Sequence, residues 1–293
     1  MTASLKTETL KFSSARPVRL ADVKHWDMET DVAIVGFGGA GSCAAIEAAD
    51  AGAAVTVFEL ASASGGSTAM SSGEVYLGGS GGTRVQKACG FEDSTENMFK
   101  FLMAAHGPQA DETKVRTYVE NAVKHFDWLV ERGVPFKDSF LDKRAIVAIT
   151  DDGLLYTGSE KAWPFRDIAK PVARGHNLQV LGDNGGPLLM KILTENVEKR
   201  KNIQVHYDTR ALCLIADEQN RVQGLVVRIN MKEQFVPVAA GDRYNAAGLP
   251  RRCDPHSSHR PGLRHRHSSL IGSGQLHHKP DIEGVCCNPS NRV

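Results

Sequence analysis

The stretch from Asp31 to Leu60, DVAIVGFGGAGSCAAIEAADAGAAVTVFEL, constrains the fold of this chain more than any other segment. Its apolar run Val32–Val35 is short and rich in β-branched residues, which is typical of a buried parallel strand. A glycine-rich turn follows, then an alanine-rich helix expected from about Gly39 to Ala51, then a second apolar run, Ala54–Phe58. This order predicts a βαβ unit.

The turn between the first strand and the helix matches the pattern G-x-G-x-x-G. Gly36 permits the tight turn, Gly38 lets the backbone approach a pyrophosphate, and Gly41 lets the helix pack closely on the strand. Glu59, about 20 residues further on, is placed to accept hydrogen bonds from a ribose 2′-hydroxyl. Because strand, helix, second strand and acidic residue all accompany the glycines, the pattern predicts a dinucleotide site rather than a mere tight turn.

Composition excludes several other classes of protein. The chain has 293 residues, 41% of them hydrophobic, which suits one large or two ordinary globular domains. A formal net charge of +1 gives no electrostatic case for binding nucleic acid or an anionic membrane surface. No apolar run approaches the ~20 residues that span a bilayer, and the N-terminal segment lacks the apolar core of a secretory signal. The six cysteines form no framework, so we expect a reduced, cytoplasmic setting.

A second loop rich in glycine and small hydroxyl residues, Ser64–Gly73, directly follows the predicted ribose-binding strand. Such a loop can bring backbone N–H groups and hydroxyls against phosphates and a flat ring system. A flexible linker would have a similar composition, but the position of the loop, and a similar run at Gly78–Gly82, argue against one. This loop favours FAD over NAD as the cofactor.

Helical periodicity and capping signals predict helices at Ser94–His106 and Asp111–Arg132, and another from Pro187 to about Lys201. Before the last of these, the cluster Gly182–Gly186 suits either contact with an anion or a plain capping loop. The period then changes to that of strands, and we expect them at Ile203–Tyr207, Thr209–Ala216, Val222–Ile229 and Gln234–Val238. A late hairpin or meander is the second feature that favours an FAD-type domain.

These residues resemble the FAD-binding half of flavoproteins in the fumarate reductase/succinate dehydrogenase superfamily, and within it the FAD-dependent 3-ketosteroid dehydrogenases of the Δ4-(5α) or Δ1 type. The resemblance covers about residues 20–238 and rests on the following stretches: VGFGGAGSCAAIEAADAGAAVTVFELAS, GGSTAMSSGEVYLGGSGGT, VQKACGFEDSTENM, WLVERGVPFKDSF, DDGLLYTGSE and ARGHNLQ. It implies an α/β fold, with a Rossmann-like parallel sheet, helices and a β-meander, that is incomplete at the C-terminus.

The resemblance also implies which residues hold FAD. They are Gly36, Gly38, Gly39, Ala40, Gly41, Glu59, Leu60, Gly66, Ser67, Thr68, Ser71, Gly73 and Ala211. The glycine turn would line the pyrophosphate, Glu59 would hold the adenosine ribose, and Ala211 would contact adenine through its backbone. The second loop would face the pyrophosphate, the ribityl chain or the flavin. No catalytic residue and no metal ligand is assigned.

Enzymes of this kind remove two hydrogens from adjacent carbons of a 3-oxosteroid, with the hydride passing to flavin N5. The expected partners are therefore a steroid or another small enone and an electron acceptor that the sequence does not identify. Two alternatives stay open. One is a fumarate-reductase-like flavoprotein acting on another enone or enoate, and the other is a non-catalytic FAD-binding fragment.

We expect three regions: a leader over residues 1–29, the FAD-binding domain with an inserted helical hairpin over 30–238, and an atypical tail over 239–293. The tail has no sustained periodicity and is rich in histidine, arginine and cysteine. A zinc module, a disordered basic arm and a reading-frame shift each remain as interpretations. We favour the frame shift, because the composition breaks where the resemblance ends, so that the substrate domain is missing.

Overall fold

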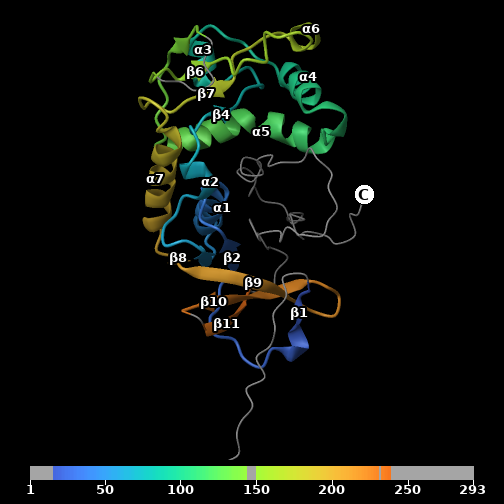
Figure 1. Ribbon diagram of the computed structural model, residues 1–293, viewed down its shortest axis with the longest axis vertical. Coiled ribbons are helices and arrows are strands. Elements are labelled where there is room, and N and C mark those ends of the chain that lie inside the picture. The colour runs from blue at the N-terminus through green and yellow to red at the C-terminus, as the bar shows by residue number, and fades with distance from the viewer. Residues whose placement is uncertain (1–15, 144–149, 231, 239–293) are drawn as a thin grey trace, which may run out of the picture.

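The computed structural model describes residues 16–143, 150–230 and 232–238. Within them lie three sheets and two groups of helices, which Figure 1 shows as an upper helical part above a lower part that contains the strands of the βαβ unit. The predicted tail and its potential metal ligands lie outside the described residues.

The centre of the lower part is a parallel sheet of three strands, β2 (Val32–Val35), β3 (Val55–Phe58) and β8 (Ile203–His206), in the order β2-β3-β8. Helix α1 (Gly39–Asp50) joins β2 to β3, and α7 (Gly185–Glu198) leads into β8. Successive side chains of a strand point to opposite faces. Ile34 accordingly packs towards the helices, while Ala33 and Val35 pack on the other face of the sheet.

That other face is covered by a meander of β9 (Thr209–Ala216), β10 (Val222–Ile229) and β11 (Lys232–Pro237). Leu225, Val227 and Val236 of the meander form one buried cluster with the parallel sheet. After β11, Val238 pairs in parallel with Thr30, just before β2. The chain therefore leaves the meander alongside the parallel sheet.

Part of the predicted leader belongs to the meander. Strand β1 (Val18–Arg19) pairs in parallel with β9 and continues into the 3-10 helix η1 (Leu20–Asp22). Asp27 binds Phe235 twice, since its N–H donates to the Phe235 carbonyl at 2.8 Å and its Oδ2 accepts the Phe235 N–H at 2.7 Å. The described part of the leader, from residue 16 onward, is thus packed on the domain.

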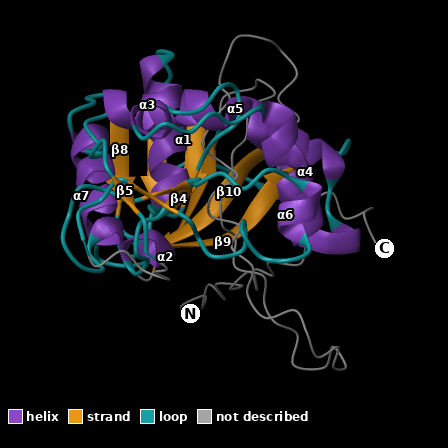
Figure 2. Cartoon of the chain, turned by 90° about the horizontal axis from the view of Figure 1, so that it is seen from above, coloured by secondary structure: helices purple, strands orange, loops and turns teal. Residues whose placement is uncertain are grey.

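The upper part is inserted between β3 and α7. It contains the short helices α3 (Arg84–Ala88) and α6 (Phe165–Ile168), the long helices α4 (Thr95–His106) and α5 (Glu112–Glu131), and the 3-10 helix η2 (Gly107–Gln109). The short helix α2 (Gly66–Ala69) also follows β3 in the chain but lies beside α1 in the lower part (Figure 1). Its small sheet has the order β4-β7-β6-β5. These strands are β4 (Val75–Tyr76), β5 (Phe140–Leu141), β6 (Leu154–Leu155) and β7 (Gly175–His176). Seen from above, α4 and α6 lie together at one end and α7 at the other (Figure 2).

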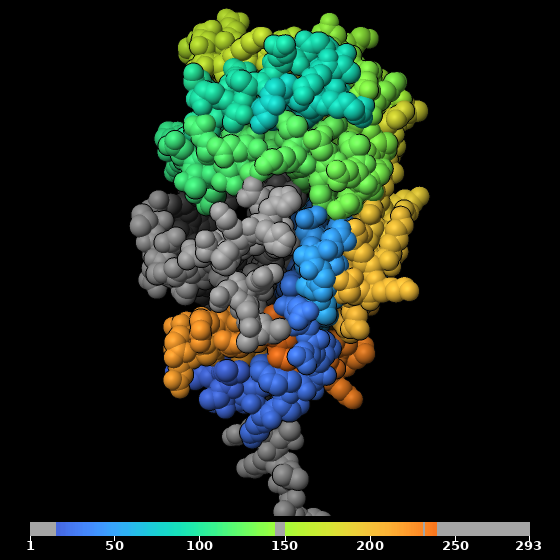
Figure 3. All heavy atoms as spheres, turned by 180° about the vertical axis from the view of Figure 1, so that it is seen from behind, coloured from blue at the N-terminus to red at the C-terminus, as the bar shows by residue number. Residues whose placement is uncertain are grey.

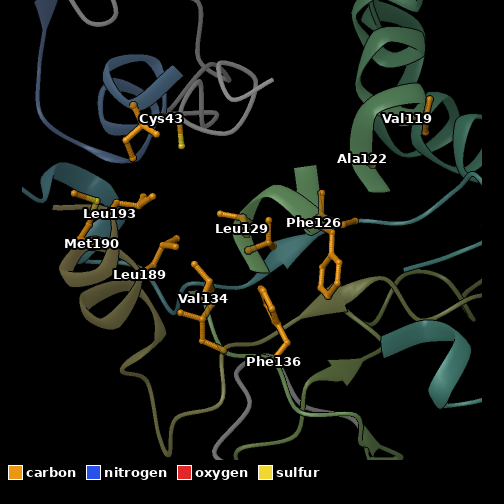
Figure 4. Packing of buried hydrophobic residues seen from close by; sticks show 14 of the residues in the cluster. Cys43, Val119, Ala122, Phe126, Leu129, Val134, Phe136, Leu189, Met190 and Leu193 are labelled. Atoms are coloured by element: carbon orange, nitrogen blue, oxygen red, sulfur yellow. The ribbon is translucent and has the colours of Figure 1, made fainter. Parts of the chain in front are cut away.

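One hydrophobic core joins the upper and lower parts. Cys43 of α1, Phe126 and Leu129 of α5, and Leu189 and Leu193 of α7 all belong to the same buried cluster (Figure 4). Burial raises the pKa of the Cys43 thiol to about 12, as expected of a packed rather than a reactive cysteine. Figure 3 shows α7 running along the flank of the molecule from the upper part to the βαβ unit. The insertion therefore shares one core with the domain that contains the βαβ unit.

A buried ion pair lies within the insertion. Arg174 and Asp93 are both fully buried and form two hydrogen bonds, from Nε to Oδ2 at 2.6 Å and from Nη2 to Oδ1 at 2.8 Å. Asp93 Oδ2 also accepts the N–H of Gly79 at 3.0 Å. Such a pair is costly to break, because removing one partner leaves the other charge buried and unpaired. It fixes the glycine-rich Gly78–Gly82 run against β7.

Most predicted elements are confirmed. The strands at 32–35, 209–216 and 222–229 agree with the prediction to the residue, and Ser94 and Asp111 cap α4 and α5 through their side chains. The predicted bounds of the helix at 187–201 are wrong, because α7 begins at Gly185 and ends at Glu198. Its first two residues are glycines that pack against backbone, which sequence periodicity does not register. No helix in the described ranges is long and apolar enough to cross a membrane.

Candidate cofactor site

The glycine turn lies at the carboxyl end of β2, where ligands bind in open α/β sheets. Gly36 has φ +98°, a conformation that favours glycine. A Cβ on Gly41 would lie 2.0 Å from the carbonyl oxygen of Gly36, so no side chain fits there without moving α1 away from β2. Gly38, in contrast, would bring a Cβ only to 3.6 Å from its nearest neighbour. Gly36 and Gly41 are therefore needed for the shape of the turn. Gly38 is not, but without a side chain it lets a ligand approach the backbone of the turn closely.

The N-terminus of α1 is ready to receive an anion. Its N-cap residue is Gly38, which offers no side chain to cap the first N–H groups. The second loop closes against it, because Gly65 pairs in parallel with Gly38 and its N–H donates to the Phe37 carbonyl at 2.9 Å. Thr68 Oγ1 accepts the N–H of Gly39 at 3.2 Å. A hydroxyl and the positive end of a helix dipole thus meet where a phosphate would lie.

Glu59 lies at the carboxyl end of β3, beside the same turn. Its Oε2 accepts the N–H of Phe37 at 2.5 Å, and its Oε1 accepts the N–H of Ala61 at 2.8 Å. Each oxygen keeps a lone pair for a further donor such as a ribose hydroxyl. The backbone carbonyl of Glu59 accepts the N–H of Thr209 at 2.8 Å, which brings the start of β9 to the same end of the site.

The second loop continues from the turn towards α7. Ser71 Oγ donates to the Thr68 carbonyl at 2.8 Å and accepts the N–H of Gly73 at 3.2 Å. Gly73 has φ +74°, and a Cβ there would lie 2.3 Å from the backbone of Gly185. The loop is therefore folded back on itself and packed on α7, which a flexible linker would not be.

The predicted site residues fall into two groups. Those of the glycine turn, Glu59 and Thr68 lie together through the contacts above, and the position of a Cβ on Gly66 is 3.7 Å from the Cα of Gly38. The second group lies around these residues. Ser67 and Ser71 are exposed, as is Gly66 of the first group, Leu60 is 63% exposed, and Ala211 is half-buried between the meander and the parallel sheet.

Glu74 is a neighbour of the site that sequence reasoning missed. It follows Gly73 directly, and its Oε1 would lie 2.8 Å from a Cβ on Gly175. Burial, and to a lesser extent the charge of Glu160, raise the pKa of Glu74 to about 7. No local sequence signal marks it, because Glu160 approaches only through the folding of the small sheet.

The residues present fit a dinucleotide. A helix N-terminus whose N-cap residue has no side chain, and a threonine hydroxyl beside it, suit a pyrophosphate; a carboxylate with free lone pairs suits a ribose, and Gly38 leaves room for close approach. This defines a dinucleotide-binding domain with a parallel sheet between helices and a β-meander. The chain belongs to the FAD binding domain family (FAD_binding_2), whose model matches residues 31–256. The prediction of FAD is thereby confirmed.

Similar proteins include flavoprotein dehydrogenases and reductases. The chain is 34% identical over 169 residues to a 3-oxo-5-alpha-steroid 4-dehydrogenase of Comamonas testosteroni, covering 56% of this chain and 31% of the relative. It is 28% identical over 221 residues to the fumarate reductase (cytochrome) of Shewanella frigidimarina, covering 75% and 33% respectively.

A solved structure, 3-ketosteroid-Δ4-(5α)-dehydrogenase from Rhodococcus jostii RHA1 in complex with 4-androstene-3,17-dione, is 47% identical with a TM-score of 0.74. That match covers 79% of this chain and 48% of the solved one. The open form of a flavocytochrome c3 fumarate reductase has a TM-score of 0.61 at 24% identity and supports the fold alone. The resemblance and fold class drawn from the sequence are confirmed, and the chain spans about half or less of these proteins.

Proposed function

We propose that this chain holds FAD in an extended form along the carboxyl edge of the parallel sheet. Glu59 would bind the adenosine ribose, with adenine beside the Ala211 backbone. The N-terminus of α1 from Gly38 onward would bind the pyrophosphate together with Thr68. The loop up to Gly73 would face the ribityl chain and the flavin. The close approach of the Gly38 turn to the Gly65–Thr68 segment carries this assignment.

We further propose that the protein is an oxidoreductase that takes two hydrogens from adjacent carbons of a 3-oxosteroid. The 47% identity to the solved steroid dehydrogenase carries this substrate class. When bound, FAD supplies the acceptor for the hydride. The described residues bind and orient the cofactor, and we assign no proton acceptor among them. A cytoplasmic setting is supported by the free thiols of Cys43, Cys89 and Cys213.

A second candidate is an FAD-binding portion without activity of its own. This candidate is favoured because the match to the solved steroid dehydrogenase covers only 48% of that protein. A third, reduction of an enoate, is favoured by the match over 75% of this chain to a fumarate reductase.

The purified chain separates these candidates. We expect it to take up FAD, measured as flavin absorbance that stays with the protein after gel filtration. Oxidation of a 3-oxosteroid with an artificial electron acceptor would support the dehydrogenase, and reduction of fumarate by a reduced viologen dye would support the reductase. Uptake of FAD with neither reaction would favour the binding portion. A chain that folds but takes up no FAD would contradict the proposal.

A further inference from the structure

A small recess lies at the N-terminus of α7, outside the contacts assigned to FAD above. Ser72, Asn177, Gly182 and Gly185 contribute to its lining, and its volume of about 10 Å³ has room for roughly one water-sized group. The recess lies where the end of the second loop meets the chain that follows β7. Gly182 and Gly185 belong to the cluster Gly182–Gly186, for which the sequence left anion contact and simple capping as alternatives.

The first turn of α7 has no side-chain cap. Asn184 occupies the N-cap position but makes no side-chain capping bond, and its Nδ2 donates to the Leu181 carbonyl at 2.9 Å. The N–H groups of Gly185 and Gly186 have no acceptor within the helix. Because α7 has 14 residues, its N-terminus also carries the positive end of a helix dipole. Of these two glycines, Gly185 lines the recess and Gly186 follows it in the chain.

Asn177 supplies a second and independent indication of a ligand. The residue is 6% exposed, and its Nδ2 is buried without a hydrogen-bond partner in the part of the chain that the structure describes. Its backbone N–H donates to the Gly153 carbonyl at 3.2 Å, which fixes the residue in place. Buried amide groups in folded proteins are nearly always paired, with protein groups or with ordered water, so an unpaired one that lines a recess is a donor for an acceptor from outside.

The recess adjoins the end of the second loop, which we propose to face the flavin. A Cβ on Gly185 would lie 2.1 Å from the Ser72 carbonyl, and one on Gly186 would lie 2.2 Å from the Ser71 carbonyl. The backbone of the first turn of α7 therefore packs directly on the backbone of the second loop at Ser71 and Ser72. An acceptor in the recess would lie beside the loop that faces the flavin.

We propose that the recess is a subsite for one oxygen atom of a carbonyl or carboxylate group, held by Asn177 Nδ2 and the first N–H groups of α7. Hydrogen-bond donors and a helix N-terminus match an oxygen that carries partial or full negative charge. Because the subsite adjoins the flavin end, the oxygen belongs either to the cofactor ring or to a substrate above it. The assignment of the oxygen to the cofactor ring or to a substrate rests on the proposed function.

Stability without ligands tests the subsite first. Asn177→Leu removes the unpaired donor at similar volume, so we expect the ligand-free variant to unfold at the same temperature as the wild type or higher. A role in holding the fold would instead lower the midpoint, and a fall of more than about 5 °C would overturn the proposal. Asn121→Asp is the matched control, since Asn121 donates to Thr117 on the outer side of α5. If the leucine variant does not fold, Asn177→Ser and Asn177→Asp carry the test.

Ligand titrations then locate the oxygen. If it belongs to the cofactor ring, Asn177→Leu and Asn177→Asp weaken FAD binding about tenfold or more while ADP, which lacks the ring, binds as to the wild type. If it belongs to a substrate, FAD binding is unchanged, while fumarate or 4-androstene-3,17-dione binds the FAD-loaded variants at least tenfold more weakly, followed by flavin absorbance. The aspartate should weaken binding more than the leucine, because its charge repels the oxygen.

Two results separate failure of this proposal from failure of the proposed function. Wild-type protein that takes up no FAD contradicts the function, and the subsite is then tested by calorimetric titration of the ligand-free chain with fumarate. Variants that bind FAD, ADP, fumarate and the steroid like the wild type overturn the subsite and leave a recess that holds water only.

Discussion

At the scale of single residues, Glu59 is the group on which adenosine binding should depend most. Both of its oxygens accept backbone N–H groups. In Glu59→Gln the side-chain NH₂ would therefore face the N–H of Phe37 or of Ala61, and two hydrogen-bond donors would meet without an acceptor. We expect FAD to bind roughly 10- to 100-fold more weakly, as for the loss of a hydrogen bond to a charged group. Quenching of flavin fluorescence measures this. Glu120→Gln, at an exposed position on α5, is the control, and equal affinity in both variants would refute the role of Glu59.

The glycines of the turn should separate into two roles. Gly41→Ala places a Cβ 2.0 Å from the Gly36 carbonyl and should destabilise the fold by about 3 kcal/mol or more, because α1 must move. Gly38→Ala meets only ordinary contacts, so it should unfold near the wild-type temperature but bind FAD at least tenfold more weakly, if the pyrophosphate approaches there. Urea denaturation and FAD titration of both variants check this. A Gly38→Ala variant with normal FAD affinity would contradict it.

The predictability of the site differs between residues for a physical reason. Gly36, Gly38, Gly41 and Glu59 could be predicted because the turn and the end of the next strand are set by local spacing within one βαβ unit. The unpaired amide of Asn177 could not, since the recess forms only when chain segments about 100 residues apart in sequence meet. The N–H groups that orient Glu59 are likewise a consequence of packing.

At the scale of elements, β7 carries a buried histidine whose lowered pKa should make the stability of the fold depend on pH. His176 Nδ1 lies 2.8 Å from the Arg174 carbonyl and Nε2 lies 2.7 Å from Thr83 Oγ1, so the neutral ring with hydrogen on Nδ1 fits both partners. Burial lowers the pKa of His176 to about 4 from an ordinary 6.5. The unfolded chain therefore binds more protons than the folded one between these two values.

We expect the free energy of unfolding to decrease as the pH falls from about 6.5 to about 4, by up to about 3 kcal/mol from His176. Glu74 acts in the opposite sense, because its raised pKa of about 7 makes stability decrease as the pH rises from about 4.5 to 7. Urea denaturation of His176→Gln and of the wild type across this range separates the two. If the difference between them did not change with pH, His176 would not be the titrating group.

Elements were predictable where they carry capping or periodic signals. α4 and α5 could be predicted from Ser94 and Asp111, whose side chains do accept the N–H groups of Asn97 and Lys114. The sheet of β4, β5, β6 and β7 could not, because each strand has two residues and so shows no alternation. The early start of α7 was missed for a related reason. Gly185–Gly186 resembles a loop in sequence, yet glycine is required there by contact with the second loop.

At the scale of the whole molecule, the meander connects the leader to the dinucleotide domain. Trp26 packs on β10, where a Cβ on Gly224 would lie 3.2 Å from its ring, and β1 extends the sheet beside β9. The meander in turn covers the face of the parallel sheet that the helices leave open. The sequence does not predict this packing, because the leader has no periodicity of its own. The leader and the domain should therefore unfold together rather than as separate regions.

Asp27 offers the test of that coupling, since it pairs with Phe235 of β11 through both its N–H and its carboxylate. Asp27→Ala removes the acceptor for the Phe235 N–H and should cost about 1 kcal/mol, so the Phe235 amide should exchange with deuterium about fivefold faster under native conditions. Asp22→Ala, an exposed aspartate of η1, serves as the control. Because the meander packs on the parallel sheet, amides of β9 and β10 should also lose protection, though less. Exchange that changes at neither Phe235 nor its neighbouring strands would show that the leader is not coupled to the domain.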